Sequence, residues 1–301
     1  MLTGIHVVFL GGDARQLEMF QKLAEMDASV TLVGFDQLSN PYHGVQRQAL
    51  SAELLATADA LVLPAVGTDD NGRVHAIFTS EEMTLTEEHI SVLKKDCVIF
   101  TGMSKPYLSK LCAKYRIELV ELFERDDVAI YNSIPTAEGA IMMAIQHTDI
   151  TLHGAEIAVL GMGRTGFTLA RTLLGLGADV TIGVRRDEHY ARASEMGFKP
   201  FYLRDLTNNV SNIDLLFNTI PTMIVTAQVI AQMPNRAVLI DLASKPGGID
   251  FRFAEKRGIK AMLAPGLPGI VAPKTAGRIL ANSISQLLLE FVQNRGNGNE
   301  L

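Results

Sequence analysis

Short apolar runs alternate with longer amphipathic segments through the first half of the chain. The runs have the length and branching of buried strands, and they lie at residues 5–10, 30–35, 61–65, 97–101 and 117–122. Between the first two runs, residues 15–26 carry apolar positions at helical spacing. Strands separated by helices predict a parallel sheet with helices on both faces.

The second half repeats this alternation. Its apolar runs lie at residues 157–160, 179–184, 215–219, 237–242 and 260–263. A long apolar helix leads into this half, with Thr136 as its N-cap, directly after Pro135. The pattern predicts an α/β protein with two doubly wound parallel-sheet domains and an interdomain cleft.

The same pattern suggests the domain bounds. We expect an N-terminal α/β domain for substrate or partner at 1–135 and a Rossmann dinucleotide-binding domain at 136–294. A helix expected at 275–293 closes the second domain and returns to the first. Residues 295–301 are polar and Gly-rich, so a flexible tail is expected there.

A glycine fingerprint follows the strand at 157–160. The motif G-x-G-x-x-G comprises Gly161, Met162, Gly163, Arg164, Thr165 and Gly166. The first glycine permits a tight turn, the second lets a pyrophosphate approach the backbone, and the third lets the next helix pack closely. The helix expected at 167–176 then offers its N-terminus to the phosphates. We expect all six residues to bind a dinucleotide; the alternative is a purely structural glycine turn.

The residues after the strand at 179–184 indicate which dinucleotide binds. An NAD site places Asp or Glu about 20 residues beyond the glycines, where it holds the ribose 2′-OH. Arg185 and Arg186 stand at that distance, and guanidinium groups suit a 2′-phosphate. The sequence therefore favours NADP. The alternatives are that both arginines are solvated surface charges, or that Asp187 holds the 2′-OH of NAD.

Composition excludes several classes of protein. The 301 residues are 48% hydrophobic and 20% charged, which is typical of a globular protein with real cores. A formal net charge of −6 and the lack of a basic run argue against a nucleic acid or membrane-surface partner. Cys97 and Cys112 are too few for a disulfide framework or a zinc site. No secretory signal or run of roughly 20 apolar residues is present, so a cytoplasmic location is expected.

Polar residues at strand ends are the next candidates, because open parallel sheets bind ligands beyond the carboxyl ends of their strands. In the second domain we expect cofactor contacts from Thr219, Pro221, Ser244 and Pro268. Lys245 is a candidate catalytic residue as a cation facing the substrate; the alternative is a solvated loop lysine. Pro268 lies in a run rich in Pro and Gly that resembles a wall of the cofactor cleft.

The first domain offers two candidate anion sites. Arg15, at the start of a helix, is expected to bind a substrate carboxylate through its guanidinium fork. The alternative is that Asp13 caps that helix and Arg15 is a surface residue. Ser104 and Lys105, after the strand at 97–101, are the second candidate for substrate binding.

Three residues at the expected domain crossing complete the candidates. Ser133 is expected to bind substrate, and Thr136 and Glu138 are candidate catalytic residues. Glu138 in an apolar helix suits an acid or base role, although a first-turn acid stabilised by the helix dipole is the alternative. The histidines form no H-x-x-x-H pattern, and no metal site or G-x-S-x-G nucleophile is predicted.

Together these segments resemble the A subunits of dipicolinate synthase, an enzyme of spore-forming bacteria that makes pyridine-2,6-dicarboxylate. The segments that carry the resemblance lie at 11–16, 132–139, 161–166, 218–221, 241–248 and 265–277. The cofactor half is also similar to alanine dehydrogenase and the 2-hydroxyacid dehydrogenases, which makes that half alone unspecific.

The resemblance implies NADP-dependent aromatisation of a dihydrodipicolinate derived from 4-hydroxy-tetrahydrodipicolinate, a lysine-pathway intermediate. This small substrate carries two carboxylates, for which Arg15, the Ser104–Lys105 pair and Lys245 are the expected anchors. A homo-oligomer, a flavoprotein-like B subunit and the mother cell of sporulation are also implied. Two alternatives stay open: another 2-oxo or 2-amino acid dehydrogenase, and a non-catalytic protein that senses NADPH while its partner performs the chemistry.

Overall fold

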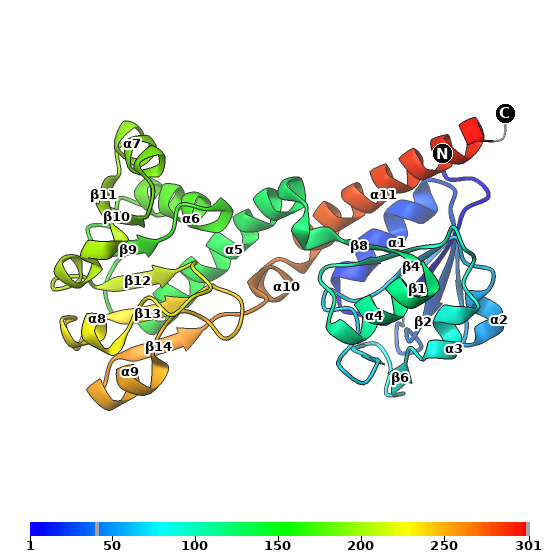
Figure 1. Ribbon diagram of the computed structural model, residues 1–301, viewed down its shortest axis with the longest axis horizontal. Coiled ribbons are helices and arrows are strands. Elements are labelled where there is room, and N and C mark those ends of the chain that lie inside the picture. The colour runs from blue at the N-terminus through cyan, green and yellow to red at the C-terminus, as the bar shows by residue number, and fades with distance from the viewer. Residues whose placement is uncertain (40–41, 299–301) are drawn as a thin grey trace. The chain divides into compact units, whose positions relative to one another are not determined.

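Two compact units make up the chain, each built on a six-stranded parallel sheet (Figure 1). The computed structural model describes residues 1–39 and 42–298, with side chains through residue 293. Unit 1 comprises Met1–Ala129 and Pro273–Leu301, and unit 2 comprises Ile130–Ala272. The prediction of two doubly wound α/β domains is confirmed.

The sheet of unit 1 has the strand order β3-β2-β1-β4-β7-β8. These strands are β1 (His6–Leu10), β2 (Ser29–Val33), β3 (Val45–Arg47), β4 (Ala60–Val62), β7 (Val98–Thr101) and β8 (Glu118–Glu121). The other elements are α1 (Arg15–Glu25), α2 (Ala52–Leu55), α3 (Glu87–Ser91), α4 (Pro106–Tyr115), α11 (Pro273–Gly298), the 3₁₀ turn η1 (Leu122–Glu124) and the hairpin of β5 (Arg73–Val74) with β6 (Met83–Thr84).

The sheet of unit 2 repeats the same topology in the order β11-β10-β9-β12-β13-β14. Its strands are β9 (Glu156–Leu160), β10 (Asp179–Val184), β11 (Lys199–Tyr202), β12 (Leu215–Asn218), β13 (Val238–Asp241) and β14 (Lys260–Leu263). The helical elements are α5 (Asp126–His147), α6 (Arg164–Gly175), α7 (Asp187–Glu195), α8 (Ala227–Ala231), α9 (Phe251–Arg257), α10 (Leu267–Val271) and the 3₁₀ turn η2 (Leu203–Asn209).

Alternating side chains of each central strand bury both faces of the sheet. In β9, Ile157 and Val159 pack under α5, α6 and α7, whereas Ala158 and Leu160 pack under η2, α8 and α9. The central strand of unit 1 divides its side chains between two cores in the same way. A strand buried on both faces must be apolar throughout, which explains the uninterrupted runs of the sequence.

Helix α5 corrects the expected helix start at Thr136. The helix begins at Asp126 and continues through Pro135, which lacks the N–H that an interior helical residue supplies. The hydroxyl of Ser133 donates to the Ile130 carbonyl and that of Thr136 donates to the Asn132 carbonyl, so Thr136 is not an N-cap. The buried alanines that follow pack against β-sheet side chains, and this packing stabilises the helix despite the proline.

Two of the four edge strands of the six-stranded sheets, β3 and β11, are absent from the sequence prediction. Both lie at one edge of a sheet, where only one neighbouring strand supplies hydrogen bonds. β3 is only partly buried or exposed, and β11 contains Pro200, which an edge strand tolerates. Neither strand therefore shows the continuous apolar run that marks a central one.

Helix α11 returns to the sheet of unit 1 and lies along α1 (Figure 1, red beside blue). Leu280, Ile284 and Leu288 of this helix enter the same core as Phe20 of α1. The helix continues through Gly298, so residues 295–298 of the expected tail are helical, and 299–301 lie outside the described residues. The helix therefore completes one core of unit 1.

Neither cysteine forms a disulfide among the described residues, and both are buried in the same core of unit 1. Burial raises the pKa of the Cys112 thiol to about 11, so this thiol is neutral near pH 7. Across the described ranges, no helix is long and apolar enough to cross a membrane.

Substituting Gly277 tests the contact between α11 and α1. A Cβ at this position would lie 2.5 Å from the Arg15 carbonyl oxygen, and the backbone has to move to admit it. We expect Gly277→Ala to lower the free energy of unfolding of unit 1 by about 1–3 kcal/mol in urea denaturation followed by circular dichroism.

The matched control is Gly175→Ala in α6, where a Cβ meets no heavy atom within 4 Å. This substitution should be neutral or stabilise by up to about 1 kcal/mol, because alanine favours a helix more than glycine does. Equal effects of the two substitutions would contradict the close packing of α11 on α1.

Candidate functional site

The strand order of unit 2 places its ligand site between β9 and β12. The chain moves outward from β9 in one direction through β10 and β11, and in the other through β12, β13 and β14. Open α/β sheets bind ligands at this switch point, beyond the carboxyl ends of the strands. The segment after β9 is the glycine fingerprint, and the segment after β12 begins with Thr219.

Three glycines at the end of β9 have different surroundings. Gly161 has a φ of +100°, and a Cβ there would lie 2.5 Å from the Thr219 hydroxyl oxygen. A Cβ at Gly166 would lie 2.1 Å from the carbonyl oxygen of Gly161. Gly163 has no heavy atom within 4 Å of such a Cβ. Gly161 therefore permits the turn and Gly166 permits the close approach of the helix, whereas Gly163 leaves open space over the backbone.

Helix α6 begins at this open space. Gly163 is its N-cap and has no side chain to occupy the N-terminus, while Arg164 and Thr165 form the first turn. Met162 is partly buried and packs against the core under α5 and α6. The backbone N–H groups of a first helical turn and the positive end of the helix dipole suit a pyrophosphate. The residues present therefore fit the diphosphate of a dinucleotide.

The ends of β12 and β13 are held by buried polar groups. Thr219 donates to the Leu160 carbonyl through both its N–H (3.0 Å) and its hydroxyl (2.8 Å). Asn218 donates to the Asp241 carboxylate at 2.8 Å, and both side chains are fully buried. Asp241 also accepts from the N–H of Gly248 at 2.7 Å. These bonds fix the two loops that frame the switch point, and sequence reasoning gave Asn218 and Asp241 no role.

The loop after β13 presents Ser244 and Lys245 to solvent, and Pro221 is also exposed after β12. Among the described residues Lys245 has no hydrogen bond or ion pair, so its ammonium group is available to an anion. Pro268 differs from expectation, because it is buried in the first turn of α10 and presents no exposed wall. Its neighbour Leu267 contacts Gly139 of α5.

The end of β10 carries the residues expected to distinguish NADP from NAD. Arg185 is exposed and has no hydrogen bond or ion pair in the described part of the chain. Arg186 makes a 3.3 Å ion pair with Glu188, and both side chains are more than 60% exposed. Asp187 accepts a 2.9 Å hydrogen bond from the Tyr202 hydroxyl of β11. The sequence pattern assigns no role to Tyr202, because its edge strand lacks the apolar run that marks a central strand.

Helix α5 separates its three candidate residues. Ser133, expected to bind substrate, is 1% exposed, and its hydroxyl bonds the Ile130 carbonyl and the Thr168 hydroxyl of α6. It therefore joins two helices. Thr136 is partly buried and donates to the Asn132 carbonyl. Glu138 is exposed, and no other described residue bonds to it.

In unit 1, Arg15 already binds a carboxylate of its own chain. Its guanidinium donates three hydrogen bonds to the Asp13 carboxylate, at 2.9, 3.2 and 2.6 Å, and its side chain is 14% exposed. Burial alone would raise the pKa of Asp13, but the hydrogen bonds and charge of Arg15 outweigh it and hold this pKa below its usual value. Asp13 also accepts from the Arg15 N–H. The fork is thus engaged within the chain. The alternative interpretation also differs from the structure, because Ala14 rather than Asp13 is the N-cap of α1 and the Arg15 side chain is mostly buried.

Ser104 and Lys105 lie at the carboxyl end of β7. The Ser104 N–H donates to the Glu121 carboxylate, and its hydroxyl pairs with that of Ser109 at 2.7 Å. Lys105 makes a 3.7 Å ion pair with Asp70, which is 72% exposed. An exposed pair at this distance is weak, so Lys105 can exchange Asp70 for another anion.

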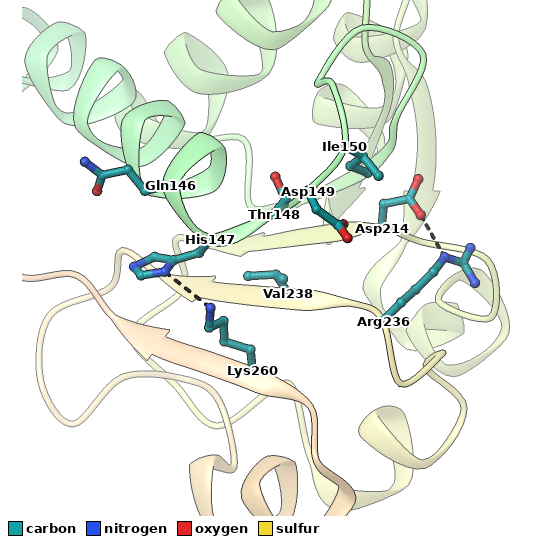
Figure 2. A pocket seen from close by; sticks show the side chains of 9 residues that line it. All are labelled: Gln146, His147, Thr148, Asp149, Ile150, Asp214, Arg236, Val238 and Lys260. Atoms are coloured by element: carbon teal, nitrogen blue, oxygen red, sulfur yellow. Dashed lines mark hydrogen bonds and ion pairs between the residues drawn. The ribbon is translucent and has the colours of Figure 1, made fainter.

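A surface hollow of about 430 Å³ lies at the opposite, amino-terminal edge of the unit 2 sheet (Figure 2). Its polar side chains form two pairs: Arg236 pairs with Asp214 at 3.0 Å, and Lys260 lies 3.4 Å from His147. Asp214 also accepts from the Glu156 N–H at the start of β9. This hollow is therefore remote from the switch point. Within the described residues, no group of three His, Cys, Asp or Glu side chains is placed to hold a metal ion.

Two family models match the two halves of the chain. The model for the N-terminal domain of the dipicolinate synthase A subunit matches residues 6–123. The model described as the alanine dehydrogenase/PNT C-terminal domain matches residues 135–299, which include the glycine fingerprint. Unit 2 is thus a dehydrogenase-type nucleotide-binding domain.

Individual relatives give the same result. The chain is 51% identical over 296 residues to the dipicolinate synthase A subunit of Bacillus subtilis (strain 168), covering 98% of this chain and all of the relative. It is 55% identical to the crystal structure of the same protein from Bacillus halodurans, with a TM-score of 0.94 over 96% of this chain and 99% of the other. A transhydrogenase from Sinorhizobium meliloti shares the fold at 18% identity, with a TM-score of 0.69 and 95% of each chain covered. Across both units, therefore, the chain belongs to the family of dipicolinate synthase A subunits.

Proposed function

We propose that this chain is an NADP-dependent oxidoreductase that converts a dihydrodipicolinate, derived from 4-hydroxy-tetrahydrodipicolinate, into pyridine-2,6-dicarboxylate. The observation that carries the proposal is the open space over Gly163 at the switch point, between two glycines whose neighbours leave no room for a side chain. A dinucleotide diphosphate fits there. Family membership then supplies the substrate class.

The residues at the fingerprint and at the end of β10 would hold the cofactor. The N–H groups at the start of α6 would bind the diphosphate, and Arg185 is available to a 2′-phosphate. Arg185 favours NADP over NAD because no described residue neutralises its charge. When bound, the nicotinamide supplies a hydride acceptor, and aromatisation of the ring supplies the driving force.

Several side chains would act on the substrate. Lys245 is the first choice for a substrate carboxylate, because its ammonium is exposed and unpaired among the described residues. Lys105 is the choice in unit 1, since Asp70 holds it only weakly, and Arg15 contributes only the part of its guanidinium that Asp13 leaves free. Glu138 is exposed and suits the proton acceptor for the hydrogen that leaves the ring as a proton.

We further propose that the chain works in an assembly. Its relatives are named as the A subunits of a synthase, and that name implies at least one further chain. The proposed partner is a flavoprotein-like B subunit, and the chain itself is proposed to form a homo-oligomer. The proposed setting is the mother cell of a sporulating bacterium.

Turnover is the direct test. The purified chain is mixed with NADP⁺ and freshly generated dihydrodipicolinate, and the absorbances of NADPH and the pyridine product are followed together. We expect equal molar rises, because each ring that becomes aromatic gives one hydride and one proton. The measurement is repeated with the B subunit. NADPH binding without turnover in either case would favour a sensing role, and turnover with pyruvate or glyoxylate would favour another dehydrogenase.

Gly163→Ala tests the cofactor cradle. We expect at least about tenfold weaker NADPH binding by isothermal titration calorimetry, which corresponds to about 1.4 kcal/mol, because the new methyl group occupies the space that the diphosphate needs. The fold should be unaffected, since no heavy atom of the described residues, apart from Gly163 and its two chain neighbours, lies within 4 Å of the new Cβ. Gly175→Ala is equally unhindered and far from the fingerprint, so it should bind NADPH normally. Unchanged binding by Gly163→Ala argues against the cradle.

Lys245→Ala tests the substrate anchor. Loss of a charge-assisted hydrogen bond costs about 1.5–3 kcal/mol, so kcat/KM for the substrate should fall roughly 10- to 100-fold while NADPH affinity changes little. Lys256→Ala, at an exposed lysine of α9, provides the control. A collapse of NADPH binding in Lys245→Ala would instead assign this lysine to the cofactor.

A further inference from the structure

The carboxyl ends of β10 and β11 lie side by side and bring three arginines to one edge of the sheet. Val184 and Tyr202 are register partners in parallel strands, so the residues that follow each of them are neighbours. Arg185 and Arg186 follow β10, and Arg204 follows β11. This edge is where the proposed function places the ribose 2′-phosphate, and the inference below rests on that proposal.

Tyr202 connects the two strand ends. Its hydroxyl donates to the Asp187 carboxylate at 2.9 Å, and its ring stacks on Tyr190 of α7 with centroids 4.8 Å apart. The Arg204 guanidinium lies over the Tyr202 ring, 4.3 Å from its centroid. The hydrogen bond to Asp187 also raises the pKa of Tyr202, so the phenol keeps its proton and remains the donor.

The carboxylates near Arg204 hold it only weakly. Its nearest ion-pair partner is Asp205, at 3.8 Å, and the two side chains are 75% and 51% exposed. Such an exposed contact contributes little, whereas the cation–π contact with the Tyr202 ring places the guanidinium along the edge. A phosphate with two negative charges would displace Asp205 readily.

Asp187 is the carboxylate best placed along this loop to accept a ribose 2′-OH. In the structure one of its oxygens already accepts from Tyr202, and it is the first residue of α7. An NAD ribose would have to compete with that phenol for the carboxylate, whereas the 2′-phosphate of NADP would be repelled by a free carboxylate. The hydrogen bond between Tyr202 and Asp187 therefore disfavours NAD, and it partly shields the 2′-phosphate of NADP from repulsion by the carboxylate.

We propose that Arg204, carried on the ring of Tyr202, is a second arginine ligand of the 2′-phosphate beside Arg185, and that the Tyr202–Asp187 hydrogen bond sets the preference for NADP over NAD. Arg204 acts on the phosphate directly. Tyr202 is a positioning residue, because it orients both the guanidinium and the carboxylate.

The test compares NADPH, NADH, 2′,5′-ADP and 5′-AMP by isothermal titration calorimetry with the full chain. We expect Arg204→Ala to weaken NADPH and 2′,5′-ADP about tenfold and to leave NADH and 5′-AMP unchanged. Tyr202→Phe keeps the ring but removes the donor, so the ratio of NADPH to NADH affinity should fall several-fold, in part because NADH binds more tightly. Arg204 is an exposed side chain, and circular dichroism checks that its variant folds.

Arg192→Ala is the matched control, since Arg192 lies on α7, is 67% exposed and pairs with Glu195. It should leave all four affinities unchanged. The inference is overturned if Arg204→Ala binds NADPH as the wild type does, or if the wild type prefers NADH. Failure of the wild type to bind either dinucleotide would overturn the proposed function as well. If Arg185→Ala weakens NADPH binding and Arg204→Ala does not, the proposed function stands and the role of Arg204 is overturned.

Discussion

The contact between Gly161 and Gly166 is the constraint on which the nucleotide-binding unit depends. The position of a Cβ at Gly166 lies 2.1 Å from the Gly161 carbonyl oxygen, so β9 and α6 approach more closely than any side chain permits. That approach directs the N-terminus of α6 over the end of β9, beside the open space at Gly163. The Thr219 hydroxyl, bonded to the Leu160 carbonyl, joins β12 to the same point. Backbone N–H groups, rather than side chains, therefore supply most of the contacts that this site offers to a phosphate.

Buried polar groups support this arrangement from below. The Asp241 carboxyl group accepts from Asn218, Ala243 and Gly248, and a buried polar group is tolerated in the interior when its oxygens are bonded in this way. These bonds hold the loops after β12 and β13 as one rigid frame. In unit 1 the strand that corresponds to β9 is β1, and the segment after it carries Asp13 and Arg15, which bind each other. The two units share a strand order but differ in what they leave open at the switch point.

The central strands and the glycine fingerprint are readable from sequence, because burial on both faces demands uninterrupted apolar runs and a close turn demands glycine. What the sequence cannot show depends on tertiary contacts. Its pattern predicts that Pro135 precedes a helix, yet this proline lies inside one, because the packing of α5 outweighs a missing hydrogen bond. Ser133 and Pro268, predicted to line a site, are buried. The partners of Asp13, Asp187 and Asp241 follow from strand register and loop geometry, which single-sequence patterns do not encode.

The path of the chain means that the two units complete their folds at different times during synthesis. Unit 2 is continuous from Ile130 to Ala272, whereas unit 1 needs α11, which follows all of unit 2 in the chain. Leu280, Ile284 and Leu288 supply part of the core above β1 and α1, so the earlier segment emerges from the ribosome with that core uncovered. Unit 2 can therefore finish folding first. The unit that begins the chain is the last to be complete, and a C-terminal truncation before Pro273 would damage it rather than the nucleotide-binding unit.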